Sequence, residues 1–492
     1  MDRFQEENSY STIFKRISAF GGVQVFNILV TLVRGKFVAL FLGPEGMGIS
    51  SLFTSSTSTL QHFGSLGLNL ALVKEVAASR DDRNLRSRII GIALRLIVLT
   101  SILGGLACMV LSPWLSYWSF GNYGYTGSFL VLGIFVALSI GGAGLLSLLQ
   151  GMAEVKRLSR ASLVGGLTGL FVGVPLYYFF GNNGIVPAMV LMGLTMFLFY
   201  YISFRQGVDY DKADIKLKSH TPLIRKLLSL GFVLMVGTLV GTAVSFAINA
   251  YIRAYGDIDN VGLFQAANSL TNQYIGIVFS AMAMDYFPRL SAVVTDPAKM
   301  RMVANRQAEV VILMVTPLVL LLMVTAPWVI QLFLSKEFLA ISDLVRWLGA
   351  GVLLQAVSFP LAYLFVAGNN KKAYIWIEIV MSNIVWLACS VGLYYCFSLI
   401  GLGISLVVRT GIDIVVDYIV VRKTYGFQYT RECLRTLAVC LSCGTAGFIF
   451  SVCMDSLFNW YVLAVCLLSI TYSLIKLKKK LSQSRMETTE DM

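Results

Sequence analysis

The sequence predicts an all-α polytopic membrane protein with about fourteen transmembrane helices, arranged as two pseudo-equivalent six-helix lobes followed by a C-terminal helix pair. The composition, the spacing of apolar stretches and an internal repeat lead to this prediction. Of the 492 residues, 57% are hydrophobic and only 13% are charged, and the mean hydropathy is +0.75. Because soluble domains carry about one-quarter charged residues, we expect this chain to fold in a lipid bilayer.

Apolar stretches of membrane-spanning length follow one another along the whole chain. A helix needs about 20 apolar residues to cross roughly 30 Å of hydrocarbon. Such stretches cover residues 14–41, 48–72, 89–111, 128–150, 161–180, 185–204, 223–252, 262–288, 307–333, 347–367, 373–397, 401–421, 434–453 and 458–475. They predict two sets of six helices and a final pair.

An internal repeat relates the two sets. The segment from Ile17 to Phe204 returns as a second segment from Gly231 to Val421. Matching residues, which we call anchors, identify the repeat. Gly48 matches Gly262 and Pro113-Trp114 matches Pro327-Trp328, each 214 positions later. Gly151 matches Gly368 and Gly184 matches Gly401, each 217 positions later. Paired helical bundles typically move a substrate across the membrane at their interface. We therefore expect an N-terminal lobe (1–204), a cytoplasmic linker (205–222), a C-terminal lobe (223–423), an extra helix pair (424–476) and a cytoplasmic tail (477–492).

The basic residues predict the orientation. In the predicted topology, 32 of the 39 Lys and Arg residues lie on the side of the two termini and of the connectors after even-numbered helices. This side is cytoplasmic by the positive-inside rule. The net charge of +13 is thus a topology signal, and nucleic acid is not an expected partner because the charges are dispersed over short loops. These connectors leave no room for an extramembrane catalytic domain.

Polar residues form a stripe along the first two helices of each repeat. At 100° per residue, each stripe falls within an arc of about 80°. The candidate site residues on these four faces are Gln24, Asn27, Thr31 and Arg34; Ser55, Ser58, His62 and Asn69; Ser245, Asn249 and Arg253; and Gln265, Asn268 and Asn272. Polar groups that face hydrocarbon are costly, so we expect the four stripes to surround water or a polar ligand.

Simpler interpretations stay open for individual residues. Ser, Thr and Asn also hold membrane helices together through hydrogen bonds worth roughly 0.6 kcal/mol each. The two arginines favour a cavity for an anion, since a guanidinium matches the oxygens of phosphate or pyrophosphate and stays charged. Arg253, at the outer end of its helix, could instead extend toward the membrane surface, and His62 could either titrate or serve as a neutral hydrogen-bonding group.

The remaining charged residues in the spans are expected to form structural ion pairs. They include Arg409, Asp413 and Asp417 at i, i+4 and i+8 on one predicted helix, and Glu378 on the helix before it. The sequence has no Gly-rich nucleotide loop, no Ser/His/Asp arrangement and no metal-ligand cluster. We therefore expect no cofactor, no metal centre and no enzymatic activity.

Two groups of motifs carry a resemblance to a known family. They are LGPEGMGISSLF (Leu42–Phe53) with FGSLGLNLALVKEVA (Phe63–Ala77), and YGDIDNVGLFQAANSL (Tyr255–Leu270) with DYFPRLSAV (Asp285–Val293). The chain resembles the polysaccharide transporter family of the multidrug/oligosaccharidyl-lipid/polysaccharide superfamily, and within it the Wzx-type O-antigen flippases, over essentially its whole length. The resemblance implies a two-lobed, MATE-like fold with a central cationic cavity lined by the first two helices of each repeat.

The resemblance also implies a function. It predicts a multi-pass protein of the bacterial inner membrane that flips an undecaprenyl-pyrophosphate-linked oligosaccharide, the repeat unit of an O-antigen, capsule or exopolysaccharide, by alternating access. Arg34 and Arg253 are the basic residues carried over to the cavity. Membrane lipid and the lipid-linked glycan are the expected partners, with a polysaccharide polymerase and its chain-length machinery as further candidates. Alternatives are a lipid II flippase, a MATE-like multidrug antiporter and a membrane glycan polymerase or ligase.

Overall fold

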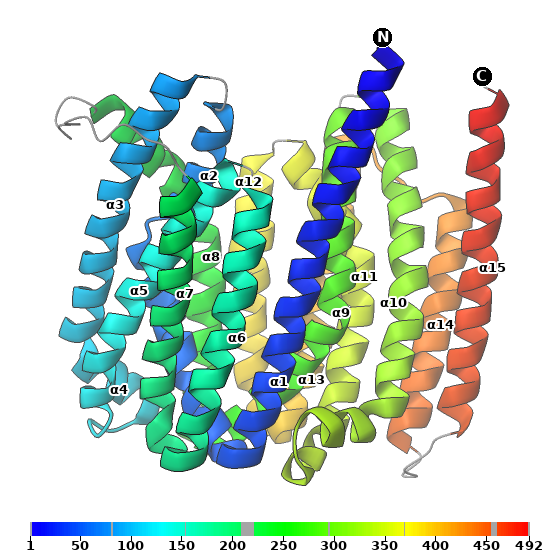
Figure 1. Cartoon of the computed structure of the whole chain (residues 1–492). Coiled ribbons are helices and arrows are strands. Elements are labelled where there is room, and N and C mark those ends of the chain that lie inside the picture. Colours follow the sequence, from blue (N-terminus) through cyan, green and yellow to red (C-terminus); the bar gives the residue numbers. More distant parts are fainter. Residues whose placement is uncertain are drawn as a thin grey trace. The chain divides into compact units, whose positions relative to one another are not determined.

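The computed structural model describes residues 2–79, 82–152, 154–207, 221–293, 296–368, 370–453 and 460–490, in which helices and turns occur and no strand is found (Figure 1). The predicted all-α class is confirmed. Ten stretches of the described residues are long and apolar enough to cross a membrane. Three of them contain a break, at Gly43, at Gly181–Gly184 and at Ser398. The chain is thus a multi-pass membrane protein, whereas the number of fourteen crossings stays a prediction.

The chain divides into two compact units, Met1–Gly262 and Leu263–Met492. The first unit contains α1 (Asp2–Gly64), α2 (Leu68–Ala78), α3 (Arg83–Val110), α4 (Ser112–Phe120), α5 (Thr126–Gly151), α6 (Val155–Phe180), the 3-10 turn η1 (Gly181–Gly184), α7 (Ile185–Gly207) and α8 (Thr221–Tyr255). Apolar side chains of α2, α3 and α5, among them Leu72, Ile90 and Leu148, form its core. In the same unit α1 packs against α6 and α8.

The second unit contains most of α9 (Ile258–Val293), then α10 (Pro297–Phe333), the 3-10 turn η3 (Lys336–Ile341), α11 (Ser342–Ala367), α12 (Lys371–Tyr374), the π-helix η4 (Ile375–Met381), α13 (Ser382–Tyr425), α14 (Arg431–Cys453) and α15 (Trp460–Glu490). Tyr286, Leu364 and Phe427 are buried in its core. α14 and α15 run side by side (Figure 1).

The structure corrects two details of the predicted helices. The stretch 48–72 is not one helix, because turn residues 65–67 separate α1 from α2 and both Leu66 and Gly67 have positive φ. Asn69 therefore lies on α2 and does not continue the polar face of α1. Between the predicted spans 89–111 and 128–150 a further helix, α4, forms and ends at Gly121, whose φ of 75° favours glycine.

The backbone makes reciprocal close contacts at the first pair of anchor glycines. A Cβ on Gly48 would lie 2.0 Å from the Ile258 carbonyl oxygen, and a Cβ on Gly262 would lie 1.9 Å from the Pro44 carbonyl oxygen. Pro44 and Ile258 are themselves equivalent positions of the repeat, at the same offset as the two glycines. These two anchor glycines thus serve the same purpose, because each lets a backbone approach that any side chain would prevent.

Candidate functional site

Three of the four predicted polar faces lie in the first unit, two of them on α1, apart from Asn69 on α2, and the third on α8. In this unit α1 packs against α8. On α1, Thr31 is exposed, Arg34 is half-buried, and a guanidinium nitrogen of Arg34 donates to the Tyr177 hydroxyl at 3.4 Å. Tyr177 belongs to α6 and is fully buried. Among the residues that the structure describes, no ion pair involves Arg34. Its positive charge is therefore held by a neutral partner.

Arg253 has a different environment. Its Nε donates to the Ser119 carbonyl at 3.0 Å, and a terminal guanidinium nitrogen donates to the Trp118 carbonyl at 3.1 Å. These are carbonyls of the last turn of α4, which a cation stabilises through hydrogen bonding and the helix dipole. The structure thus places Arg253 against the end of the short helix α4, while its assignment to substrate stays a prediction.

The other candidates of the first unit are distributed along the same helices. Ser55 donates to its own helix, at the Leu52 carbonyl, 3.2 Å away. Ser58, His62, Asn69 and Ser245 are half-buried, and Asn249 is buried. Gln24 and Asn27 lie outside the residues whose side chains are described.

The remaining candidates lie on α9 in the second unit. The Asn272 amide donates to Asn268 Oδ1 at 2.9 Å, and the Gln273 amide donates to the Ser269 hydroxyl at 2.9 Å. Gln265 is half-buried one turn before Asn268. The polar face of α9 is thus a ladder of amides and hydroxyls along one helix. A cavity shared by all four predicted faces stays a prediction.

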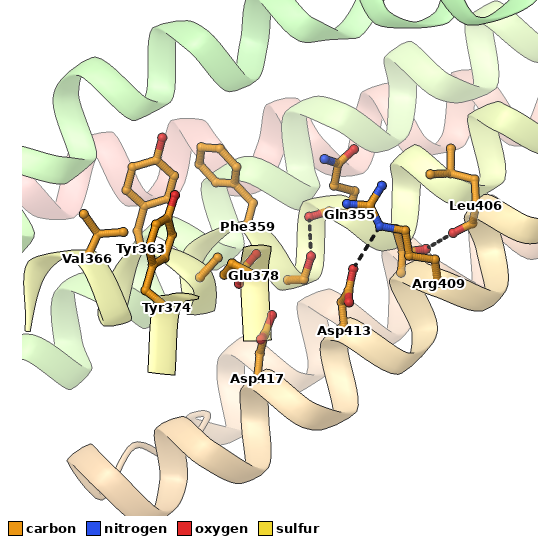
Figure 2. Close-up of a pocket in the computed structure, with 13 residues that line it drawn as sticks. Gln355, Phe359, Tyr363, Val366, Tyr374, Glu378, Leu406, Arg409, Asp413 and Asp417 are labelled. Carbon is orange, nitrogen blue, oxygen red and sulfur yellow. Dashed lines mark hydrogen bonds and ion pairs between the residues drawn. The ribbon is translucent and has the colours of Figure 1, made fainter. Parts of the chain in front are cut away.

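A charged cavity of about 380 Å³ lies within the second unit, lined by α11, the α12–η4 segment and α13 (Figure 2). Three carboxylates and one guanidinium line it, from Glu378, Arg409, Asp413 and Asp417. Successive turns of α13 supply the last three, because they are spaced at i, i+4 and i+8. The π-helix η4 supplies Glu378, and π-helical turns occur frequently at functional sites.

One half of the cavity contains an ion pair and a bridging hydroxyl. Arg409 Nε lies 3.5 Å from Asp413 Oδ2 and donates to the Ser382 hydroxyl at 3.0 Å. Ser382 in turn donates to the same Asp413 oxygen at 2.9 Å. The Arg409 guanidinium also lies over the ring of Trp386, 5.0 Å from its centroid. Arg409 and Asp413 therefore form an ion pair through Asp413 Oδ2. Asp413 Oδ1 is buried and has no hydrogen-bond partner among the described residues.

The other half of the cavity holds carboxylates without partners. The Asp417 side chain is 1% exposed, and neither of its carboxylate oxygens has a hydrogen-bond partner among the described residues. One carboxylate oxygen of Glu378 also has no hydrogen-bond partner among the described residues. Figure 2 shows both residues beside the cavity. Gln355, Tyr363 and Tyr374 also line it. Such groups cost free energy when ionised, so this region is able to take up a proton or a cation.

Sequence reasoning noted these charges but interpreted all of them as structural ion pairs. That interpretation is correct for Arg409 with Asp413 and wrong for Asp417, which has no such partner among the described residues. The i, i+4, i+8 spacing of Arg409, Asp413 and Asp417 was the sequence signal that these side chains lie on one face of a helix. The π-helical turn that brings Glu378 to the cavity has no comparable signature in the sequence.

Comparisons with known proteins agree with this architecture. The family described as "Polysaccharide biosynthesis protein" matches residues 37–343. The lipid III flippase of Escherichia coli (strain K12) is 22% identical over 354 residues, covering 71% of this chain and 83% of the relative. A putative O-antigen transporter of Shigella flexneri is 20% identical over 359 residues, covering 70% of this chain and 82% of that relative.

Solved structures share the fold. The lipid II flippase MurJ in an inward closed conformation superposes with a TM-score of 0.71 and 13% identity, over 95% of this chain and 99% of that chain. An inward-facing MATE family multidrug transporter of the MOP superfamily gives a TM-score of 0.70 and 18% identity, over 81% and 94%. The fold is therefore that of MOP superfamily transporters. The family match covers residues 37–343, which is more than half of the sequence. This chain therefore belongs to the polysaccharide biosynthesis protein family.

Proposed function

We propose that this protein flips an undecaprenyl-pyrophosphate-linked oligosaccharide across the bacterial inner membrane, as a step in making a surface polysaccharide. Relatives named as a lipid III flippase and an O-antigen transporter support a lipid-linked cargo. The cargo combines a polyprenyl tail, a pyrophosphate and sugars. A protein that moves it needs a cation for the pyrophosphate and neutral polar groups for the sugars.

Arg34 is the observation that carries this proposal. Its guanidinium lies on the polar face of α1, half-buried, and its described partner is the neutral hydroxyl of Tyr177. A hydroxyl can orient the guanidinium without neutralising it. The positive charge stays available for an anion, and forked donors match the oxygens of a pyrophosphate.

Neutral polar groups lie on the same two helices, α1 and α8. α1 and α8 pack together in the first unit, with Ser55, Ser58 and His62 on the one and Ser245 and Asn249 on the other. Hydroxyl and amide groups can donate to and accept from sugar hydroxyls. In the proposed cycle the pyrophosphate binds Arg34 while the sugars contact these groups, and the polyprenyl tail remains in lipid.

The charged cavity of the second unit is the proposed place where the cycle is coupled to a cation. Arg409 already balances Asp413. We propose that Glu378 and Asp417 share a proton or a monovalent cation, because the buried Asp417 carboxylate has no partner among the described residues and an oxygen of the half-buried Glu378 has none either. Uptake and release of that cation would change the charge on α13 and η4.

Three variants test the role of Arg34. Arg34→Ala should lower export of the surface glycan by about tenfold to 100-fold, since a hydrogen bond to a charged group is worth roughly 1.5–3 kcal/mol. Tyr177→Phe removes the 3.4 Å hydrogen bond but keeps the charge, so its export should stay near the wild-type level. Lys36→Ala, two positions along α1, controls for loss of a nearby positive charge.

The assay uses cells that lack their own exporter and scores surface glycan against the amount of folded protein. Normal export by Arg34→Ala, or an equal loss in all three variants, would contradict the anion site. Proteoliposomes then distinguish the cargo: a polyprenyl-pyrophosphate oligosaccharide should be flipped faster than lipid II, and a cationic drug should not be transported. Faster transport of lipid II or of the drug would favour the MurJ-like or MATE-like alternative.

A further inference from the structure

A second polar cavity, of about 700 Å³, lies between α14 and α15. These helices follow the second repeat, which ends near Val421, so they belong to neither copy. The cavity is lined by three basic residues, Arg435, Lys476 and Lys479, and by one acid, Glu432. We call it the basic groove. Its net charge of +2 differs in sign from that of the charged cavity described above.

The basic groove lies at a water–lipid boundary. Lys476 and Lys479 follow the apolar part of α15, and Trp460 and Tyr461 begin that helix. At 1.5 Å per residue, Trp460 and Lys476 are about 24 Å apart along the helix, close to the thickness of the hydrocarbon layer. Trp and Tyr are enriched at both membrane–water interfaces, and basic residues are in excess on the cytoplasmic side. The basic groove therefore opens at the level of lipid headgroups.

One of its cations is fixed in place. The Lys476 ammonium donates to the Thr436 hydroxyl, lies 3.9 Å from a Glu432 carboxylate oxygen and stands 5.9 Å from the centroid of the Tyr472 ring. Its side chain is only 17% exposed. Arg435 and Lys479 are exposed, and neither forms an ion pair with another described residue. The groove thus offers one oriented ammonium and two cations available to a ligand.

The surface next to the groove is apolar. Val439 lines the groove on α14 and is well exposed, and Leu468, one turn from Tyr472 on the same face of α15, is among the most exposed apolar residues. A ligand with a phosphate in the groove would have apolar chains on this surface. Sugars would find few partners, because Tyr472 supplies the only neutral polar side chain among the described residues of the lining.

We propose that the basic groove binds an anionic phospholipid of the membrane through its phosphate, with the acyl chains along Val439 and Leu468. Basic pockets between transmembrane helices on the cytoplasmic side bind lipid headgroups of this kind. A cavity of this volume is in the range of small-ligand sites. The bound lipid is a resident of the helix pair and distinct from the transported glycan, since the groove recognises charge and offers little to a sugar.

The test measures phosphatidylglycerol relative to phosphatidylcholine bound to the full-length protein, after purification from vesicles containing equal amounts of both. The wild type should retain phosphatidylglycerol preferentially. The double substitution Arg435→Gln with Lys479→Gln should reduce this preference by up to about 25-fold at low salt, since each basic residue near an anionic surface contributes roughly a factor of five. Both residues are exposed, so the variant should fold.

Lys478→Gln is the matched control, because Lys478 is equally exposed, adjacent in sequence and absent from the groove lining. It should leave the preference unchanged. An equal loss in this control, or a wild type without preference, would overturn the proposal. So would displacement of the lipid by inorganic phosphate, which would indicate an ion site, or by polyprenyl pyrophosphate at lower concentration, which would make the groove part of the cargo path.

Discussion

The helix pair α6–α7 of the first repeat and the segment from η4 through α13 of the second have the same backbone and different side chains. Gly181 and Ser398, equivalent positions of the repeat, end the first helix of each pair with φ and ψ of 54° and −136° and of 52° and −138°. Shortly after them, a Cβ on Gly184 would lie 2.2 Å from the Leu176 carbonyl oxygen, and one on Gly401 would lie 2.0 Å from that of Leu393. The two turns are built alike.

The two pairs differ at the positions that line the charged cavity of the second. At the offset that relates Gly184 to Gly401, the positions of Arg409, Asp413 and Asp417 correspond to Met192, Met196 and Tyr200. In the first repeat these methionines pack against a glycine face, with Met192 near Gly169 and Met196 near Gly165. In the second repeat, the equivalent face carries Glu378 and Ser382. The two copies thus share a backbone, whereas apolar packing occupies these positions in the first and charged residues occupy them in the second.

The largest expected effect comes from breaking the ion pair of the second copy. Arg409→Met introduces the residue of the first copy and leaves Asp413 buried without its cation. Removing one partner of a buried ion pair typically costs about 3–5 kcal/mol. The yield of monodisperse protein and its unfolding temperature in detergent should therefore fall sharply.

The fourfold variant Glu378→Ala, Arg409→Met, Asp413→Met and Asp417→Tyr replaces the whole set by its counterparts. Well-packed apolar substitutes for buried charges are often neutral or stabilising, so this variant should fold better than Arg409→Met alone. Its glycan export should nevertheless be lost if the cavity couples transport to a cation. Normal export by the folded variant would show that the charges are structural.

The second prediction concerns the shared turn. Gly401→Ala and Gly184→Ala each place a methyl group close to a backbone oxygen, at 2.0 Å and 2.2 Å. Backbone must then shift, and overpacking of this kind typically costs about 1–3 kcal/mol. Both variants should lose folded protein by similar amounts. Gly392→Ala is the control, because a Cβ there meets no atom within 4 Å; an equal loss in the control would contradict the steric explanation.

The third prediction exchanges the residues at the break. Ser398 has a positive φ that is unfavourable for any residue except glycine, and strain of this kind costs about 1–3 kcal/mol. Ser398→Gly should therefore raise the unfolding temperature, and Gly181→Ser should lower it. Changes of the same sign in the two variants would show that the turns are not equivalent.

The sequence predicted the repeat and the helices because both depend on properties that a sequence displays, namely apolar length and glycines at fixed offsets. It did not predict the break at Leu66–Gly67 or the π-helix around Glu378, because no proline marks either one and glycines are frequent throughout the predicted spans. It also did not show the partners of side chains. Arg34 and Arg253 were both predicted to bind an anion, but one bonds to a hydroxyl and the other to the end of α4.

The smallest expected effect concerns the helix caps that the two copies share. Asp82 begins α3 and Asp296 begins α10, at equivalent positions of the repeat, with φ and ψ of −102° and 100° and of −103° and 103°. Each carboxylate accepts two backbone N–H bonds, of 3.0 to 3.2 Å. Asp82→Ala should cost about 1 kcal/mol, as for other N-caps. Asp296→Ala should lower the unfolding temperature to a similar degree. Unequal changes would mean that the two caps contribute differently to stability.

The cap at Asp296 also has a defined pH dependence. The N–H of Lys299 and then that of Ala298 bond to its carboxylate and lower the pKa of Asp296 below its usual value. A group whose pKa is lower in the folded state stabilises the fold above its unfolded pKa of about 4, and this contribution is lost as the pH falls through the folded-state value. Asp296→Asn keeps the acceptor oxygen and removes the titration. Its unfolding temperature should equal that of the wild type at pH 7 and fall less steeply in acid, and parallel curves for the two proteins would contradict a role for this carboxylate.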